Sequence, residues 1–220
     1  MKKLFKDWTL FEIILLIISF ILIIVSGVIC RSEVLTICAS VSGVLCALLQ
    51  AKGKVISQFV GLIEAVLYSI VSFKNQFYGE VIIYVTIMAP LYIMGIISWI
   101  RNKNEETNTV NKNTILLKEW IILTIVNIIV FIGLYYILKY FNTSQLFVST
   151  LSMTTSLTAT YLIARRSKYS FVFYILNDVI LLLLWGLPII KGDFTLIPMI
   201  ISPTILLTED IYGWKNWNKE

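Results

Sequence analysis

The chain is 220 residues long, with 58% hydrophobic and 14% charged residues, whereas soluble domains are about 45–50% apolar and about 25% charged. Too few polar side chains are present to cover a water-facing surface. This excludes a soluble protein and predicts an integral membrane protein surrounded by lipid. The chain also has no histidine, and its three cysteines form no C-x-x-C pair, so it offers no imidazole base, metal site or cofactor motif. We therefore expect no catalytic residues and no enzyme.

Eight stretches of the chain are long and apolar enough to cross a membrane, for which a helix needs about 20 mostly apolar residues. In chain order they are 10–29, 33–50, 55–73, 80–100, 115–138, 146–164, 169–187 and 194–213. The polar stretch 101–114 has no apolar periodicity and is predicted to be a linker without a soluble domain. We therefore expect residues 1–220 to form one all-α transmembrane domain of about eight helices.

The basic residues are distributed unevenly between the two sides of this predicted bundle. Fourteen of the 18 lysines and arginines lie on the side that holds both termini and the loops 51–54, 101–118 and 165–168. Because cytosolic loops of membrane proteins are enriched in lysine and arginine, both termini are predicted to be cytosolic. The same bias accounts for the net charge of +5 without a nucleic-acid partner, and we expect none.

Residues 51–100 and 164–217 share a weak internal pattern. Lys54 precedes Lys168 by 114 positions, and the same spacing separates Glu64 from Asp178. Pro90 and Pro203 are 113 positions apart, as are Gly79-Glu80 and Gly192-Asp193, and Trp99 is matched with Trp214. Because chance matches would scatter in their spacing, the pattern predicts an internal repeat.

This repeat predicts a specific division of the helices. We expect two three-helix repeats, 33–100 and 146–213, with an extra N-terminal helix at 10–29. The helix at 115–138 would be a linker that lets the second repeat enter the membrane in the same orientation as the first. Parallel repeats around a central site are typical of transporters.

Glu64 and Asp178 are, of the 13 acidic residues, the two that fall at the predicted bilayer midplane. A charge there costs about 2.5–3.5 kcal/mol and tends to be functional, although a structural hydrogen bond between helices is an open alternative. Other candidates for substrate binding share helix faces with these two acids or lie at mid-span in the linker helix. They are Gln58, Tyr68, Asn127, Phe171, Tyr174, Asn177 and Trp185. Such aromatics and amides suit a flat ring with hydroxyl groups, including a cationic ring, whereas ordinary packing is the simpler explanation of Phe171 alone.

Three segments of the chain resemble the PnuC-type bacterial vitamin transporters. They are 43–80, the pair Gly95 and Trp99, and the closing YGWKNW at 212–217. The resemblance implies a multi-pass protein of the bacterial cell membrane with a SWEET-like 3+1+3 fold, often assembled as a homotrimer. It also implies facilitated diffusion of an unphosphorylated vitamin, which a cytosolic kinase then traps. Nicotinamide riboside, a precursor in NAD biosynthesis, is the substrate of the best-known members.

The nicotinamide riboside members of that family carry a W-x-x-W-x-x-N/D pattern in the helix that matches 169–187. Here the two tryptophan positions hold Phe171 and Tyr174, and the last position holds Asn177. The resemblance then implies that Phe171 and Tyr174 stack with a ring and that Asn177 hydrogen-bonds the sugar or the amide. Glu64 or Asp178 would orient helices or balance a cationic ring.

The first hypothesis is therefore a uniporter for nicotinamide riboside. Other members carry thiamine, riboflavin or deoxynucleosides, and these substrates stay open because both tryptophans are replaced. A proton-coupled symporter, with Glu64 or Asp178 as the proton carrier, is a second hypothesis. A membrane scaffold protein is a third.

Overall fold

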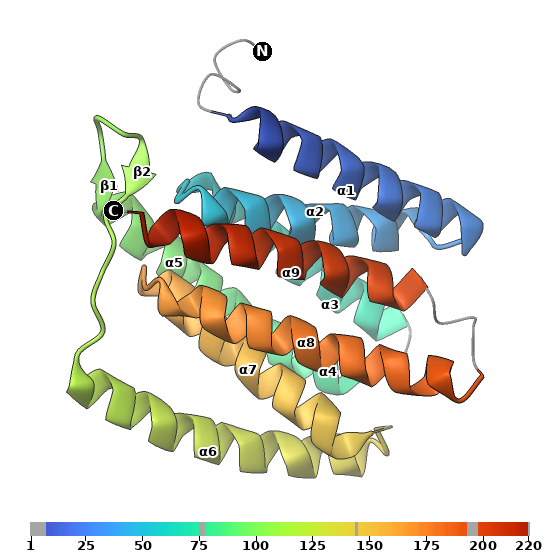
Figure 1. Ribbon diagram of the computed structural model, residues 1–220. Coiled ribbons are helices and arrows are strands. Elements are labelled where there is room, and N and C mark those ends of the chain that lie inside the picture. The colour runs from blue at the N-terminus through green and yellow to red at the C-terminus, as the bar shows by residue number, and fades with distance from the viewer. Residues whose placement is uncertain (1–7, 75–77, 144, 193–197, 220) are drawn as a thin grey trace.

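The computed structural model describes residues 8–74, 78–143, 145–192 and 198–219 (Figure 1). Its helices are α1 (Leu10–Ile29), α2 (Val34–Ala51), α3 (Ile56–Lys74), α4 (Tyr78–Ile83), the π-helix η1 (Tyr84–Met88), α5 (Ala89–Arg101), α6 (Leu117–Tyr140), α7 (Leu146–Ala164), α8 (Tyr169–Ile190) and α9 (Pro198–Trp217). Two short strands, β1 (Lys103–Asn104) and β2 (Thr109–Val110), pair antiparallel.

The described residues form eight long helical segments. One of these segments consists of α4, η1 and α5, which follow one another without a break. The π-helical turn lies next to Pro90, which has no backbone N–H to continue the regular α-helical bonding. Six of these segments are long and apolar enough to cross a membrane: α1, α2, α3, Val81–Arg101, α6 and α7. Within the described residues, the ends of the predicted stretches agree with the helices within about four residues. The predicted start of the last stretch, at 194, lies outside the described residues. That α8 and α9 also cross the membrane stays a prediction.

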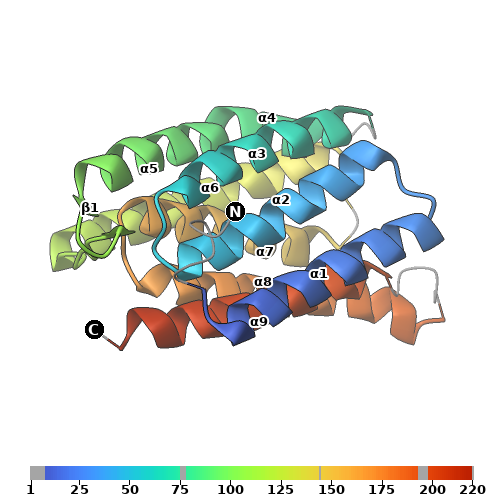
Figure 2. The same cartoon turned by 90° about the horizontal axis from the view of Figure 1, so that it is seen from above.

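The helices pack side by side in one bundle (Figures 1 and 2). Helix α2 contacts α3 and α9, and α8 packs between α7 and α9. Helix α5 contacts both α3 and α7 and so joins the two predicted repeats on the other side. Helices α1 and α6 lie at opposite margins, where α1 contacts α2 and α9, and α6 contacts α7. The arrangement places α2, α3, α5, α7, α8 and α9 around the interior.

The turn between α2 and α3 has the same backbone hydrogen bonds as the turn between α7 and α8. The backbone N–H groups of the first turn donate as follows: Lys52 to the carbonyl of Leu48, Gly53 to that of Gln50, and Lys54 to that of Leu49. The second turn has the same three bonds: Arg165 to Tyr161, Arg166 to Ile163, and Ser167 to Leu162. Each residue of the second turn lies 113 positions after its counterpart, and Gly53 and Arg166 both have positive φ angles, of 65° and 60°. The turns therefore agree with the spacing of 113 that separates Pro90 from Pro203, whereas the spacing of 114 that pairs Glu64 with Asp178 is one residue too long. With a spacing of 113, Glu64 corresponds to Asn177 instead of Asp178.

Two buried tryptophans repeat one interaction at the same end of the bundle. The indole N–H of Trp99 donates to the carbonyl of Ile163 at 2.8 Å, and that of Trp217 donates to the carbonyl of Gln50 at 3.1 Å. Gln50 and Ile163 are again 113 positions apart, so Trp217 is the counterpart of Trp99, and the predicted match with Trp214 is wrong. The two indole rings are 6.0 Å apart. These correspondences support the parallel repeat, and its 3+1+3 division stays a prediction.

We expect replacement of Trp99 or Trp217 by phenylalanine to lower the stability of the protein by about 1–2 kcal/mol. Each substitution removes the buried hydrogen bond of the indole N–H and leaves a cavity where part of the indole ring was packed. The measurement is the melting temperature of the purified protein in detergent, with Trp120→Phe on α6 as the control. Equal melting temperatures for all three variants would contradict this prediction.

The predicted linker at 101–114 is ordered and covers this end of the bundle. Val110 is buried against Trp99 and Trp217, and its N–H donates to the carbonyl of Gly53 at 2.9 Å. Farther along, the N–H of Asn113 donates to the carbonyl of Arg166, also at 2.9 Å. The loop therefore donates a backbone hydrogen bond to the residue with positive φ in each turn, Gly53 and Arg166. The polar composition of the loop did not predict this order. We call this side, with both turns and residues 102–116, the hairpin end.

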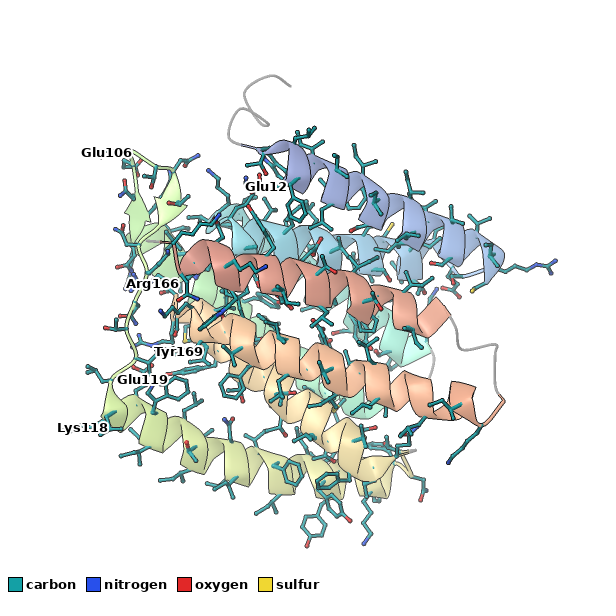
Figure 3. The ribbon with its side chains drawn as sticks, viewed as in Figure 1. Glu12, Glu106, Lys118, Glu119, Arg166 and Tyr169 are labelled. Carbon is teal, nitrogen blue, oxygen red and sulfur yellow. The ribbon has the colours of Figure 1, made fainter. Side chains whose placement is uncertain are left out.

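Helices α1 and α6 are each anchored to the hairpin end by a glutamate in their first turn (Figure 3). Glu12 of α1 pairs with Lys52 at 2.5 Å, and both side chains are buried. Glu119 of α6 pairs with Arg165 at 2.7 Å, and this carboxylate raises the pKa of the Arg165 guanidinium. Lys52 and Arg165 are counterparts in the two turns, so the two anchors correspond as well.

Candidate substrate-binding site

Three carboxyl groups meet where α8 packs against α9. Asp178 is 2% exposed, Glu209 is fully buried and Asp210 is 4% exposed. The side chains of Asp178 and Asp210 lie next to each other, and Glu209 is a further charged neighbour of Asp178. Among the described residues, neither carboxylate oxygen of Glu209 has a hydrogen-bond partner. Such groups are costly to bury unless something satisfies them.

Glu64 approaches the same region from α3. Its carboxylate packs against Gly43 of α2, where an added Cβ would come within 2.9 Å of Oε1. One turn farther along α2, the thiol of Cys46 lies within electrostatic range of Glu64, Glu209 and Asp210. The buried side chain of Cys46 is therefore a common neighbour of carboxyl groups on α3 and α9. Gly43 is needed here because it leaves room for the Glu64 carboxylate.

Two tyrosines border these carboxyl groups. The hydroxyl of Tyr174 on α8 is 3.2 Å from that of Thr160 on α7, and Tyr174 lies within electrostatic range of Glu64 and Asp210. Tyr92 on α5 is buried next to Cys46. An added Cβ on Gly61 would overlap the Tyr92 ring. The structure therefore places Tyr174 near Glu64, one of the two predicted carboxylates.

Asn177 is held by hydroxyl groups of α7. Its Oδ1 accepts hydrogen bonds from Ser152 at 2.8 Å and from Thr155 at 3.2 Å. These two bonds fix the orientation of the amide and identify Oδ1 as its acceptor. Asn127 of α6 has a similar bond, from Thr158 at 2.9 Å, but this bond joins α6 to the outer side of α7. We therefore assign Asn127 to the packing of α6.

Other predicted site residues lie in separate surroundings. Phe171 is fully buried in the hydrophobic cluster at the hairpin end, against Trp217, so it packs the core. Gln58 is fully buried against Gly95 of α5. Tyr68 stacks on Tyr84, with ring centroids 4.4 Å apart. The side chain of Trp185 lies outside the described residues.

Sequence reasoning missed Glu209 and Asp210, as well as Cys46 and Tyr92. Glu209 and Asp210 are also buried, within α9, and that Glu64 and Asp178 lie at the bilayer midplane stays a prediction. The signal was present as two adjacent acids inside the predicted span 194–213. It was missed because these acids lie close to the polar end of that span. Cys46 and Tyr92 carry no signal, because small thiols and aromatics are common in apolar helices.

Comparison with known proteins gives a consistent result along almost the whole chain. The family model described as nicotinamide mononucleotide transporter matches residues 33–219. A nicotinamide riboside transporter PnuC from Neisseria mucosa is 23% identical over 222 residues, which cover 99% of this chain and 84% of that protein. The protein of the same name from Haemophilus influenzae is 24% identical over 216 residues, which cover 97% of this chain and 92% of that protein.

A solved structure has the same fold. It is described as the crystal structure of the vitamin B3 transporter PnuC, and it superposes with a TM-score of 0.79 at 23% sequence identity. The match covers 99% of this chain and 94% of the solved chain. The family match extends over the helices that carry Glu64, Tyr174, Asn177 and Asp178. The chain therefore belongs to the nicotinamide mononucleotide transporter family and is a PnuC-type, multi-pass membrane transporter.

Proposed function

We propose that the protein takes up nicotinamide riboside by facilitated diffusion across the bacterial cell membrane. The observation that carries this proposal is the family match over residues 33–219, and the names of two relatives supply the substrate. A cytosolic kinase would trap the substrate by phosphorylation. The excess of basic residues at the hairpin end supports a cytosolic location for that end and for both termini.

The site supports this assignment through the chemistry of three side chains. Tyr174 provides an aromatic face for the ring, and Asn177 provides amide N–H donors for a sugar hydroxyl or a carboxamide. Because Ser152 and Thr155 already bond the Asn177 oxygen, the amide meets the substrate in one orientation. Asp178 supplies negative charge beside both residues. Tyr174 takes the stacking role alone, since Phe171 is enclosed in the core.

Uptake into proteoliposomes tests the proposed mechanism. Labelled nicotinamide riboside should enter without any ion gradient and stop at equal concentrations inside and outside. It should accumulate further only when a nicotinamide riboside kinase and ATP are enclosed in the vesicles. Thiamine, riboflavin and deoxyuridine are the comparison substrates. Uptake no faster than into empty vesicles for all four compounds would contradict the proposal.

The same experiment distinguishes uniport from proton-coupled transport. One structural observation favours proton coupling. Asp178 and Asp210 are buried neighbours, and two carboxylates held so close repel each other unless one of them binds a proton. A proton carrier would let an imposed pH gradient drive the substrate above equilibrium without a kinase. Accumulation that disappears when the gradient is collapsed would favour the symporter over the uniporter.

Replacing Asn177 with alanine should lower the uptake rate by about tenfold or more, because a site that is built to hydrogen-bond a polar group loses its donor. The matched control is Thr124→Ala on α6. The Thr124 hydroxyl donates within its own helix, to the carbonyl of Trp120. Initial rates of uptake should therefore be near wild type for Thr124→Ala. Similar rates for both variants would remove Asn177 from the site.

A further inference from the structure

Gln58 is a polar side chain buried between three helices. It lies in the first turn of α3 and is fully buried, and neither atom of its amide forms a hydrogen bond with any described residue. The amide packs against Gly95 of α5, where an added Cβ would overlap Oε1 and would lie 3.5 Å from the Cβ of Ala164 on α7. Buried polar groups in native proteins nearly always have partners, and burial without one is unfavourable. The packing of α5 against α3 and α7 therefore carries a free-energy cost at this point.

The second half of the chain has an apolar residue at the matching position. With the spacing of 113 found for the two turns, Gln58 corresponds to Phe171. Phe171 packs against Gly213 of α9, as Gln58 packs against Gly95, and each glycine lies four residues before one of the two corresponding tryptophans. The same architecture therefore accommodates an apolar side chain here, and an amide is not needed to fill the space.

Further buried polar groups without a partner gather at the same end of the bundle. The hydroxyls of Ser57 in α3 and Ser170 in α8 are counterparts, and both are fully buried without a bond to any described residue. The hydroxyl of Ser167, in the turn before α8, is buried and unpaired in the same way. Water would satisfy these groups if the helices separated here. The unpaired groups therefore favour a form in which the hairpin end is open.

Hydrogen bonds at the end of α5 oppose this separation. The indole N–H of Trp99 donates to the carbonyl of Ile163 on α7 at 2.8 Å, and the loop that follows α5 donates from Val110 and Asn113 to the two turns. At its other end, α5 continues directly from η1 and Pro90 (Figure 1), and π-helical turns and prolines are places where helices bend. Helix α5 therefore has a point of bending at one end and a few breakable bonds at the other.

We propose that α5 is the gate at the hairpin end of the transport pathway, and that the unpaired amide of Gln58 favours its opening. This inference rests on the proposed transport function and names the element that moves. When α5 bends at η1, water reaches Gln58, and the Tyr92 ring moves away from the buried thiol of Cys46, against which it packs. A polar group in the closed contact keeps the closed and open forms close in free energy, as alternation between them requires.

Chemical labelling of Cys46 measures this opening without any substrate. The other two cysteines, Cys30 and Cys38, are exposed and are first replaced by serine in the full-length protein. The protein is reconstituted into vesicles, and a charged, water-soluble methanethiosulfonate reagent is supplied on both sides of the membrane. Because Cys46 is 2% exposed in the closed form, its rate of labelling should follow the fraction of molecules that are open.

Two variants should shift the opening in opposite directions. Gln58→Met fills a similar space without an amide, so it should slow the labelling of Cys46 by about tenfold and slow the uptake of nicotinamide riboside as well. Trp99→Phe removes a bond that holds α5 closed, so it should speed labelling by about tenfold. The control is Trp120→Phe on α6, which should label at the rate of the serine background.

The outcomes separate the gate from other roles of these residues. An unchanged labelling rate in Gln58→Met would overturn the inference, and slower uptake at that unchanged rate would make Gln58 a residue of the binding site instead. If Gln58→Met does not fold, an unchanged labelling rate in Trp99→Phe would overturn the inference in its place. Failure of nicotinamide riboside to enter wild-type vesicles would reject the transport function, whereas the labelling rates would still show whether α5 opens.

Discussion

Replacing Lys52 with methionine should destabilise the protein by about 3–5 kcal/mol, the range measured when one partner of a buried ion pair is removed. The side chains of Lys52 and Glu12 are 6% and 3% exposed, and their charged atoms are 2.5 Å apart. Glu12 would keep the hydrogen bond from the Tyr212 hydroxyl at 2.7 Å, but it would lose its counter-ion. The loss should appear as a lower melting temperature of the purified protein in detergent.

Two further variants identify the cause of that loss. Lys74→Met removes a partner from an exposed ion pair with Glu33 and should cost less than about 1 kcal/mol. Adding Glu12→Gln to Lys52→Met should recover much of the stability, because the uncompensated charge is then gone. If Lys52→Met and Lys74→Met melted at the same temperature, the pair would not stabilise α1 as described.

A single methyl group at Gly213 should cost about 1–3 kcal/mol, as overpacking of a filled core usually does. A Cβ at this position would overlap the ring of Phe171, with Cδ1 2.6 Å and Cζ 2.9 Å away. Phe171 cannot move aside easily, since it is fully buried and its ring centroid is 5.4 Å from that of Trp217. Gly213→Ala should therefore lower the melting temperature.

Gly133→Ala is the matched control for this substitution. A Cβ at Gly133 in α6 would have no atom within 4 Å, and alanine favours a helix over glycine by about 1 kcal/mol. This variant should be as stable as the wild type or more stable. A Gly213→Ala variant that behaved like Gly133→Ala would show that α9 can shift away from α8 at little cost.

The sequence predicted the helices well because a membrane imposes a simple rule on length and polarity. Long apolar stretches such as 10–29 and 146–164 coincide with α1 and α7. The hairpin end was predicted poorly, since its order depends on backbone bonds from Val110 and Asn113 to turns far away in the chain. Backbone bonding of this kind leaves little trace in residue types.

The site was predicted in part, and its main error has a physical cause. Tyr174, Asn177 and Asp178 were predicted because they share one helix and stand out in an apolar stretch, and their role in binding stays a prediction. Matching Glu64 to Asp178 followed residue chemistry, but the geometry of the two turns matches Glu64 to Asn177. A shift of one residue turns a helix position by about 100°, so similarity of side chains alone could not fix the register.

The anchors of α1 and α6 change how the chain can be divided. Glu12 and Glu119 are each the third residue of their helix, and each pairs with the basic residue that follows the next helix, Lys52 or Arg165. Helix α1 thus has the same relation to the first half of the chain as α6 has to the second. The molecule can be described as two tandem units of four helices, 10–101 and 117–217. A unit with an even number of spans returns the chain to its starting side, so duplicating it yields two halves of equal orientation without a separate linker helix.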